Sequence, residues 1–276
     1  NKVAVPEGAA GTPPFWSDAV SVTTVTVTYR LYRFCFLYYW YLFIYRYRST
    51  IYSIIDREKQ EKKESNSHTV NLLGVTPLDF GPQKNVEALK ENLQKYGWEV
   101  TSSWAMGDDL ETLQRSGKAE VNLVVSAVGL RAAKVLWETY KIPYVIGTPN
   151  EWLAEDISKA LEGAVTQQTT SKAVYLENRM QADVQITLIG EPVTMGSLAA
   201  GIEKHYGHST RVLCPLKECE SLIGEKDKVV LGEEAMEEEL KGAKIIVADP
   251  LYKPICPKDS TFYELAHVAF SGRIYF

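Results

Sequence analysis

The chain has 276 residues, of which 45% are hydrophobic and 24% are charged. This composition excludes a disordered or collagen-like chain, because it supplies enough apolar material for one large core or two medium cores. The formal net charge is −5. A general nucleic-acid-binding protein normally carries a basic face, so we expect no nucleic-acid partner.

The first 66 residues differ in composition from the remainder of the chain. Residues 19–55 contain four Arg and no Asp or Glu, so this stretch carries +4 and the rest carries −9. Half of the residues in Tyr29–Tyr52 are aromatic. Alternating Val and Thr predict a strand over Val20–Tyr29. The charged stretch 56–67 is typical of a solvated helix end and linker.

The aromatic run Phe34–Tyr45 is uncharged but has only 12 residues. A membrane-spanning helix needs roughly 20 apolar residues, so we expect no membrane span. Three interpretations stay open: a segment lying in a membrane interface, a buried strand or helix, or a remnant translated out of frame. We favour the last and expect 1–66 to be an atypical N-terminal segment. The chain opens on Asn1 rather than Met, as a fragment would.

Four cysteines are too few and too scattered for a disulfide scaffold; they are Cys35, Cys214, Cys219 and Cys256. No basic region followed by an apolar core indicates a signal peptide. We therefore expect a reducing, cytoplasmic setting. The three later cysteines are weak candidates for ligands of a metal cluster, because no fourth cysteine completes the usual set. Structural or incidental thiols are the interpretation that we favour.

From residue 68 onward, short apolar runs alternate with helical patterns. The clearest helix carries Val86, Leu89 and Leu93 three and four residues apart and stops at Gly97. In this half the sequence predicts strands over 69–75, 98–103, 121–125 and 142–146, and helices over 85–96, 109–116 (starting from Asp108) and 129–140.

The alternation then repeats. A strand over 185–189 leads into Pro192, which suits the first turn of a helix that continues through Tyr206 and stops at Gly207. Between the halves, 151–180 has a helical pattern with a polar break at 167–170. Further strands are predicted over 210–213 and 244–248, and a further helix over 233–241, whose acidic run suits a solvated helix face.

These patterns predict an α/β fold with two doubly wound, Rossmann-like domains after the atypical segment. Each domain is a three-layer arrangement with a parallel sheet, because parallel strands need crossover helices. We expect the first domain to span 67–165 and the second to span 166–276. Doubly wound sheets bind ligands at the loops that follow the carboxyl ends of their strands.

Candidate site residues follow from that rule, although neither GxGxxG nor a P-loop occurs. The strand-end positions that we select as cofactor-binding candidates are Leu78, Asp79, Phe80, Trp104, Met106, Ser126, Gly129, Gly190, Glu191, Asp249 and Cys256. Gly190-Glu191 also suits a simple turn before a helix. His205 and His208 suit a helix C-terminus. For His267 a packed or capping role is favoured over an acid–base role.

Several ordered motifs after residue 68 resemble the nitrogenase component 1 superfamily. They are VNLLG, GWEV, GDDLETL, VNLVV and KIPYVIG in the first half, and ITLIGEP and IIVADPLYKPICP in the second. The resemblance covers about 68–276. The motifs of the second half resemble especially an uncharacterised nitrogenase-like branch of that superfamily. The order of these motifs along the chain carries the resemblance.

The resemblance implies a subunit with three doubly wound domains that pairs with a homologous subunit, as a homo- or heterodimer. It also implies low-potential electrons from an ATP-dependent iron–sulfur reductase and an iron–sulfur cluster between the paired subunits. The family's cluster cysteines lie in a first domain that is missing or disrupted here, where only Cys35 occurs. Ser126 occupies the position of a cofactor-binding cysteine of the nitrogenase catalytic subunit.

The leading hypothesis is therefore a component of a nitrogenase-like oxidoreductase that reduces a bound cofactor or tetrapyrrole-like substrate. An alternative is a non-catalytic binding or scaffold homologue that has lost its cluster. A third is a membrane-associated protein anchored by Leu31–Tyr47.

Overall fold

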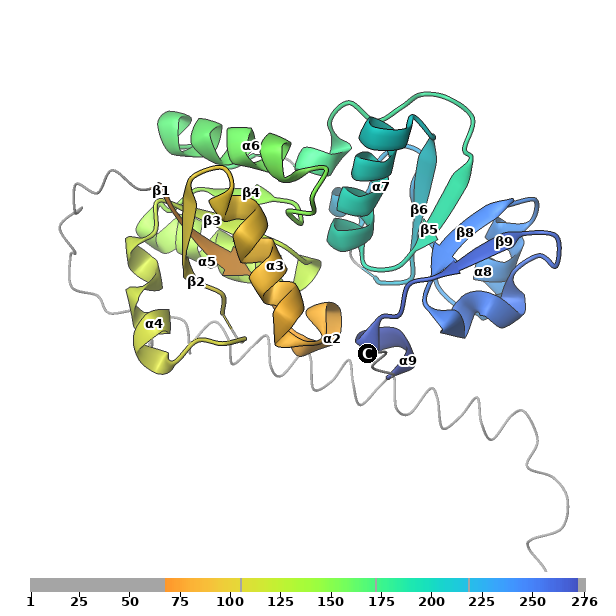
Figure 1. Cartoon of the computed structure of the whole chain (residues 1–276), viewed down its shortest axis with the longest axis horizontal. Coiled ribbons are helices and arrows are strands. Elements are labelled where there is room, and N and C mark those ends of the chain that lie inside the picture. Colours follow the sequence, from red (N-terminus) through yellow and green to blue (C-terminus); the bar gives the residue numbers. More distant parts are fainter. Residues whose placement is uncertain (1–67, 105, 172, 218, 273–276) are drawn as a thin grey trace, which may run out of the picture. The chain divides into compact units, whose positions relative to one another are not determined.

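The computed structural model describes residues 68–104, 106–171, 173–217 and 219–272. The predictions for the strand at 20–29, the aromatic run at 34–45 and the linker at 56–67 lie outside these residues. Within them, the chain forms two all-parallel sheets of four and five strands with flanking helices (Figure 1). The predicted α/β class with two Rossmann-like arrangements is confirmed. The exact domain bounds stay a prediction.

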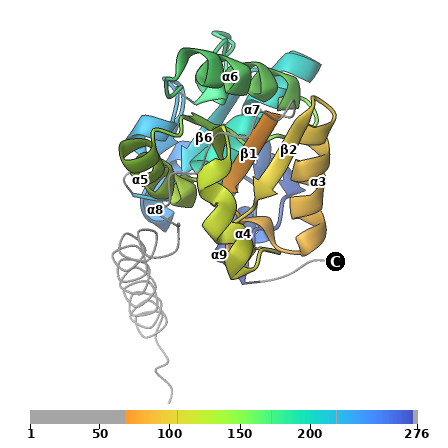
Figure 2. The same cartoon turned by 90° about the vertical axis from the view of Figure 1, so that its left-hand side faces the viewer.

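The first sheet has the strand order β2-β1-β3-β4. The chain adds β2 on one side of β1 and then β3 and β4 on the other side, and this change of direction places helices on both faces of the sheet. Helices α3 and α6 contact each other, and α5 lies on the opposite side from α3 (Figures 1 and 2). The bounds are β1 His68–Leu73, α2 Pro77–Phe80, α3 Gln83–Gln94, β2 Trp98–Ser102, α4 Leu110–Arg115, β3 Val121–Val124, α5 Leu130–Tyr140, β4 Tyr144–Ile146 and α6 Ala154–Gln167.

The second sheet has the order β7-β6-β5-β8-β9. Leu188 packs in a cluster with α7 residues, whereas its neighbour Ile189 packs in a cluster with α8 residues. This alternation builds one core on each face of the sheet. The bounds are β5 Ile186–Ile189, α7 Pro192–Tyr206, β6 Thr210–Cys214, β7 Lys228–Val229, α8 Glu233–Leu240, β8 Ile245–Ala248, β9 Thr261–Glu264 and α9 Val268–Ser271.

Most predicted elements are confirmed, with a few corrections. Helix α4 is capped by Asp109, whose side chain accepts the Thr112 N–H, and not by Asp108. In 151–180 the helix ends at Gln167, and only a short 3-10 turn follows at Val174–Leu176. The sequence patterns did not predict α2, β7, β9 and α9, which are short. Among the described residues, no helix is long and apolar enough to cross a membrane.

One buried cation ties the elements of the second sheet together. The Arg179 guanidinium forms ion pairs with Glu203 of α7 at 3.0 Å and with Asp227 at 3.5 Å, and it donates to the Thr210 carbonyl at 3.1 Å. Burial alone would raise the pKa of Glu203, but hydrogen bonds from Met180, Thr210 and Arg179 outweigh it and lower that pKa. Glu203 is therefore charged, and the Arg179 guanidinium pairs with both buried acids.

Replacing Arg179 by Met is expected to destabilise the protein by about 3–5 kcal/mol, because two buried carboxylates lose their cation. The loss would be measured as the change in free energy of unfolding in a urea titration. The matched control is Lys204→Met, which removes the half-exposed ion pair with Asp156 and should cost less than about 1 kcal/mol. Equal losses for the two variants would contradict the assigned role of Arg179.

Candidate functional site

The loops at the carboxyl ends of the two sheets contact each other. The Ala127 N–H, just after β3, donates to the Glu191 carboxylate at 2.8 Å. The Thr148 N–H, just after β4, donates to the Ser197 hydroxyl at 2.8 Å, and the Asn150 amide donates to the Ser197 carbonyl at 2.9 Å. Both sheets belong to one compact unit of the chain. The loops after β3 and β4 thus contact the segment that follows β5.

Glu191 has two roles at this contact. It is the N-cap of α7, where its carboxylate accepts the Val193 N–H at 3.1 Å and the Thr194 N–H at 2.7 Å, and Pro192 occupies the first turn. The interpretation of Gly190-Glu191 as a turn before a helix is therefore confirmed. The same carboxylate also reaches the other sheet through Ala127. Burial, followed by the nearby Asp79 charge, raises the pKa of Glu191 to about 7.

Asp79 faces the contact from the first sheet. Its carboxylate accepts the Thr76 hydroxyl at 2.8 Å, while Thr76 in turn caps α2 by accepting the Asp79 N–H. The Ser126 hydroxyl donates to the Gly74 carbonyl at 2.8 Å and lies 3.2 Å from the Asp79 carboxylate. Burial raises the pKa of Asp79, although the Thr76 hydrogen bond and His267 counteract it. Two sequence-selected residues, Asp79 and Ser126, therefore meet.

His267 lies between Asp79 and Asp249, the residue that follows β8. Asp249 accepts the Leu251 N–H at 2.9 Å, the His267 N–H at 2.7 Å and the Ser271 hydroxyl at 2.9 Å. The His267 Nε2 lies 3.6 Å from Asp79 Oδ1, and within the described residues neither ring nitrogen has a hydrogen-bond partner. Burial lowers the pKa of His267, against the pull of both carboxylates. His267 is a packed histidine, which is the role that the sequence favours, and its neighbours are Asp79 and Asp249.

Asp79, Glu191, Asp249 and His267 form what we call the acidic cluster. Other selected residues do not belong to it. Trp104 and Met106 are buried in the turn after β2, where the Ser103 hydroxyl donates to the Met106 carbonyl at 2.7 Å and Asp108 accepts the Trp104 N–H at 3.1 Å. Phe80 is buried in α2, whereas its neighbour Leu78 is exposed. Cofactor binding by any of these residues stays a prediction.

Gly129 is required by backbone packing, and cofactor binding at this position stays a prediction. A Cβ added there would lie 2.4 Å from the Leu73 carbonyl carbon and oxygen and 2.7 Å from the Gly74 nitrogen. The backbone after β3 therefore passes against the backbone after β1, and only glycine allows that approach. At Gly190 an added Cβ would meet Met195, a flexible side chain, at 2.8 Å. That contact is easier to relieve.

The iron–sulfur cluster implied by the resemblance does not fit the described residues. Within residues 68–104, 106–171, 173–217 and 219–272, no three His, Cys, Asp or Glu side chains gather closely enough to hold a metal ion. A hydrogen bond with Cys219 and, as a smaller cause, burial raise the pKa of Cys214, and burial raises the pKa of Cys256. Both changes favour the protonated thiol, whereas cluster ligands are thiolates. Cys256 instead lies 3.2 Å from the Tyr252 carbonyl. Cys35 lies outside the described residues.

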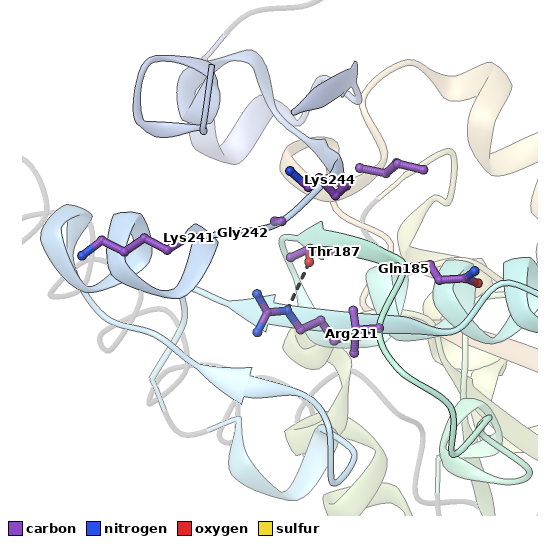
Figure 3. A pocket seen from close by; sticks show the side chains of 9 residues that line it. Gln185, Thr187, Arg211, Lys241, Gly242 and Lys244 are labelled. Atoms are coloured by element: carbon purple, nitrogen blue, oxygen red, sulfur yellow. Dashed lines mark hydrogen bonds between the residues drawn. The ribbon is translucent and has the colours of Figure 1, made fainter. Parts of the chain in front are cut away.

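A separate open cavity of about 410 Å³ lies at the amino ends of β5 and β8 (Figure 3). Its cationic side chains are already engaged. Arg211 donates to Thr187 at 3.1 Å and to the Glu239 carbonyl at 2.6 Å, and Lys244 pairs with Asp259 at 2.6 Å. Lys241 pairs with Glu238. This cavity lies at the opposite strand ends from the acidic cluster, and its charges are balanced.

The fold and the cluster at the strand ends define a doubly wound α/β protein with its candidate site between two sheets. The sequence profile of the nitrogenase component 1 type oxidoreductase family matches residues 44–182, half of the chain. The chain therefore belongs to this family, as the resemblance implied. The match begins within the stretch that the composition marks as atypical.

Curated relatives include one of the subunits of light-independent protochlorophyllide reductase. The Crocosphaera subtropica protein is 33% identical over 99 residues, which cover 33% of this chain and 20% of the relative. The Chlorobium luteolum protein is 25% identical over 177 residues, which cover 60% of this chain and 34% of the relative. The chain thus spans about a fifth to a third of these relatives. A solved structure described as nitrogenase Cp1 at pH 5 is 19% identical in sequence and has a TM-score of 0.40. Its alignment covers 70% of this chain and 42% of the chain in that structure.

Replacing Gly129 by Ala is expected to destabilise the protein by about 1–3 kcal/mol, because the new methyl group must push two backbone segments apart. Gly163→Ala is the matched control. Gly163 lies within α6 with nothing within 4 Å of an added Cβ, so Ala should stabilise the protein by about 0.5–1 kcal/mol. Chemical denaturation measures both changes. A neutral or stabilising Gly129→Ala would show that the backbone approach does not constrain this loop.

Proposed function

We propose that the chain is a component of a nitrogenase-like oxidoreductase that accepts low-potential electrons and reduces a bound cofactor or a tetrapyrrole-like substrate. The observation that carries this proposal is family membership over residues 44–182. The name of the relatives, light-independent protochlorophyllide reductase, supports the tetrapyrrole class. The chain's own strand-end loops from both sheets supply the surface on which such a substrate would be held.

The proposal includes the partners and setting that the resemblance implies. These are a homologous subunit, an ATP-dependent iron–sulfur reductase and a cytoplasmic location. No step of the chemistry is assigned to a cluster held by the described residues, because their thiols do not form a ligand set. Asp79, Ser126 and Glu191 are the chain's own polar groups at the strand ends. Because these side chains are themselves buried, their proposed part is to position the strand-end loops that hold the polar edge of the substrate.

A second candidate function is a non-catalytic binding or scaffold component. The observation that favours it is the missing ligand set: among the described residues, no three metal-ligating side chains come together. Such a component would keep the fold and the subunit pairing of the family without a cluster of its own.

The two candidates are separated by isolating the full chain with its homologous subunit, freed of the iron–sulfur reductase, under anaerobic conditions. If the chain is an electron-transfer component, this complex should contain iron, show cluster absorbance, and reduce added protochlorophyllide in an ATP-dependent reaction once the reductase is added back. A complex in which the homologous subunit is present and iron is absent would contradict electron transfer and favour the scaffold. Iron without any effect on protochlorophyllide would contradict the tetrapyrrole class alone.

A further inference from the structure

We propose that the contact between the two sheets is a proton-binding site, at which Asp79, Glu191 and His267 together hold a proton that they release when the sheets separate. The inference does not rest on the proposed function. It concerns only this chain's own side chains and the contact that Glu191 makes with Ala127.

The first observation is that two buried carboxylates, which are near enough to interact electrostatically, are hydrogen-bonded to two consecutive residues and have no Lys or Arg partner among the described residues. The Ser126 hydroxyl lies 3.2 Å from the Asp79 carboxylate, and the next residue along the chain, Ala127, donates its N–H to Glu191. The exposed fractions are 2% for Glu191 and 8% for the Asp79 side chain. In the part of the chain that the structure describes, no Lys or Arg forms an ion pair with either carboxylate; the partner of Asp79 is His267 at 3.6 Å.

The second observation is how the same chain treats another buried acidic pair. Glu203 and Asp227 are also almost fully buried, and the guanidinium of Arg179 lies between them at 3.0 and 3.5 Å. Two like charges removed from water without such a partner are strongly unfavourable. Where no arginine neutralises two buried carboxylates, binding one proton removes one of the two negative charges.

The groups that face this cluster limit where the proton can reside. Tyr175 and Cys214 lie close enough to Glu191 to interact with it electrostatically. Burial raises the pKa of Tyr175. The hydrogen bond with Cys219 and, as a smaller cause, burial raise the pKa of Cys214. Both side chains therefore stay neutral. Asp249 faces His267 and accepts three hydrogen bonds there. The titratable groups at the contact between the sheets are therefore Asp79, Glu191 and His267, with Asp249 as a neighbour of His267.

The sign of the effect differs between the carboxyl groups and the histidine. Burial and the Asp79 charge raise the pKa of Glu191 from 4.5 to about 7, so its contribution to the contact is complete below pH 4.5 and is lost as the pH rises through about 7. Burial lowers the pKa of His267 from 6.5, so its contribution has the opposite sign and weakens the contact as the pH falls below 6.5. The two effects partly cancel in the unmodified protein.

Two variants of the full chain separate these opposing effects. In His267→Gln the opening of the contact should increase up to about tenfold per pH unit between pH 5 and about 7, because one proton leaves Glu191. In Glu191→Gln that increase should be absent or reversed. Opening is measured by hydrogen exchange of the Ala127 amide and its neighbours, with each rate divided by the intrinsic exchange rate at that pH.

The control is Asp156→Asn, which removes an exposed ion pair with Lys204 and should leave the pH profile of the unmodified protein unchanged. Identical pH profiles for His267→Gln and Glu191→Gln would overturn the proposal. If Glu191→Gln does not fold, Asp79→Asn serves as the second variant. Removing the like charge should lower the pKa of Glu191 and move the midpoint in the His267→Gln background to lower pH; an unmoved midpoint would also overturn it.

Discussion

The hydrogen bond from the Ala127 N–H to the Glu191 carboxylate is the interaction on which the arrangement of the candidate site depends. It joins the loop after β3 of the first sheet to the loop after β5 of the second. The same carboxylate caps α7, so the start of that helix and the contact between sheets share one side chain. Asp79, which accepts a hydrogen bond from Ser126 next to Ala127, lies 3.6 Å from His267. A change at Glu191 therefore affects a helix terminus, a sheet-to-sheet contact and a buried charge together.

Much of the fold follows from local patterns in the sequence. Val86, Leu89 and Leu93, predicted as the apolar face of a helix, are the buried residues of α3. Strand β9 was missed because Thr261–Glu264 is a largely exposed edge strand without apolar alternation. That omission also concealed the role of His267, which follows the carboxyl end of β9. Asp79, Ser126 and Glu191 could be selected because they follow strands that were predicted; that they meet depends on tertiary packing.

Family membership and the described side chains lead to different levels of functional detail. The nitrogenase component 1 type match covers 44–182 and supports an oxidoreductase ancestry. The described thiols, however, are buried or bound to backbone carbonyls and form no ligand set. What these residues do offer is a buried acidic cluster at the strand ends, the place where doubly wound folds carry their sites. At Gly129 the close approach of two backbone segments requires glycine, whether or not a ligand binds there.

The most direct measurement is a carbon-13 NMR titration of the Glu191 carboxyl group. The full chain would be labelled at glutamate carboxyl carbons, and the Glu191 signal would be assigned by its absence in Glu191→Gln. If the carboxyl group is buried beside Asp79 without a cation, its pKa should be about 7. A pKa at or below the ordinary value of 4.5 would mean that the group is solvated or neutralised, and it would contradict the account of this contact.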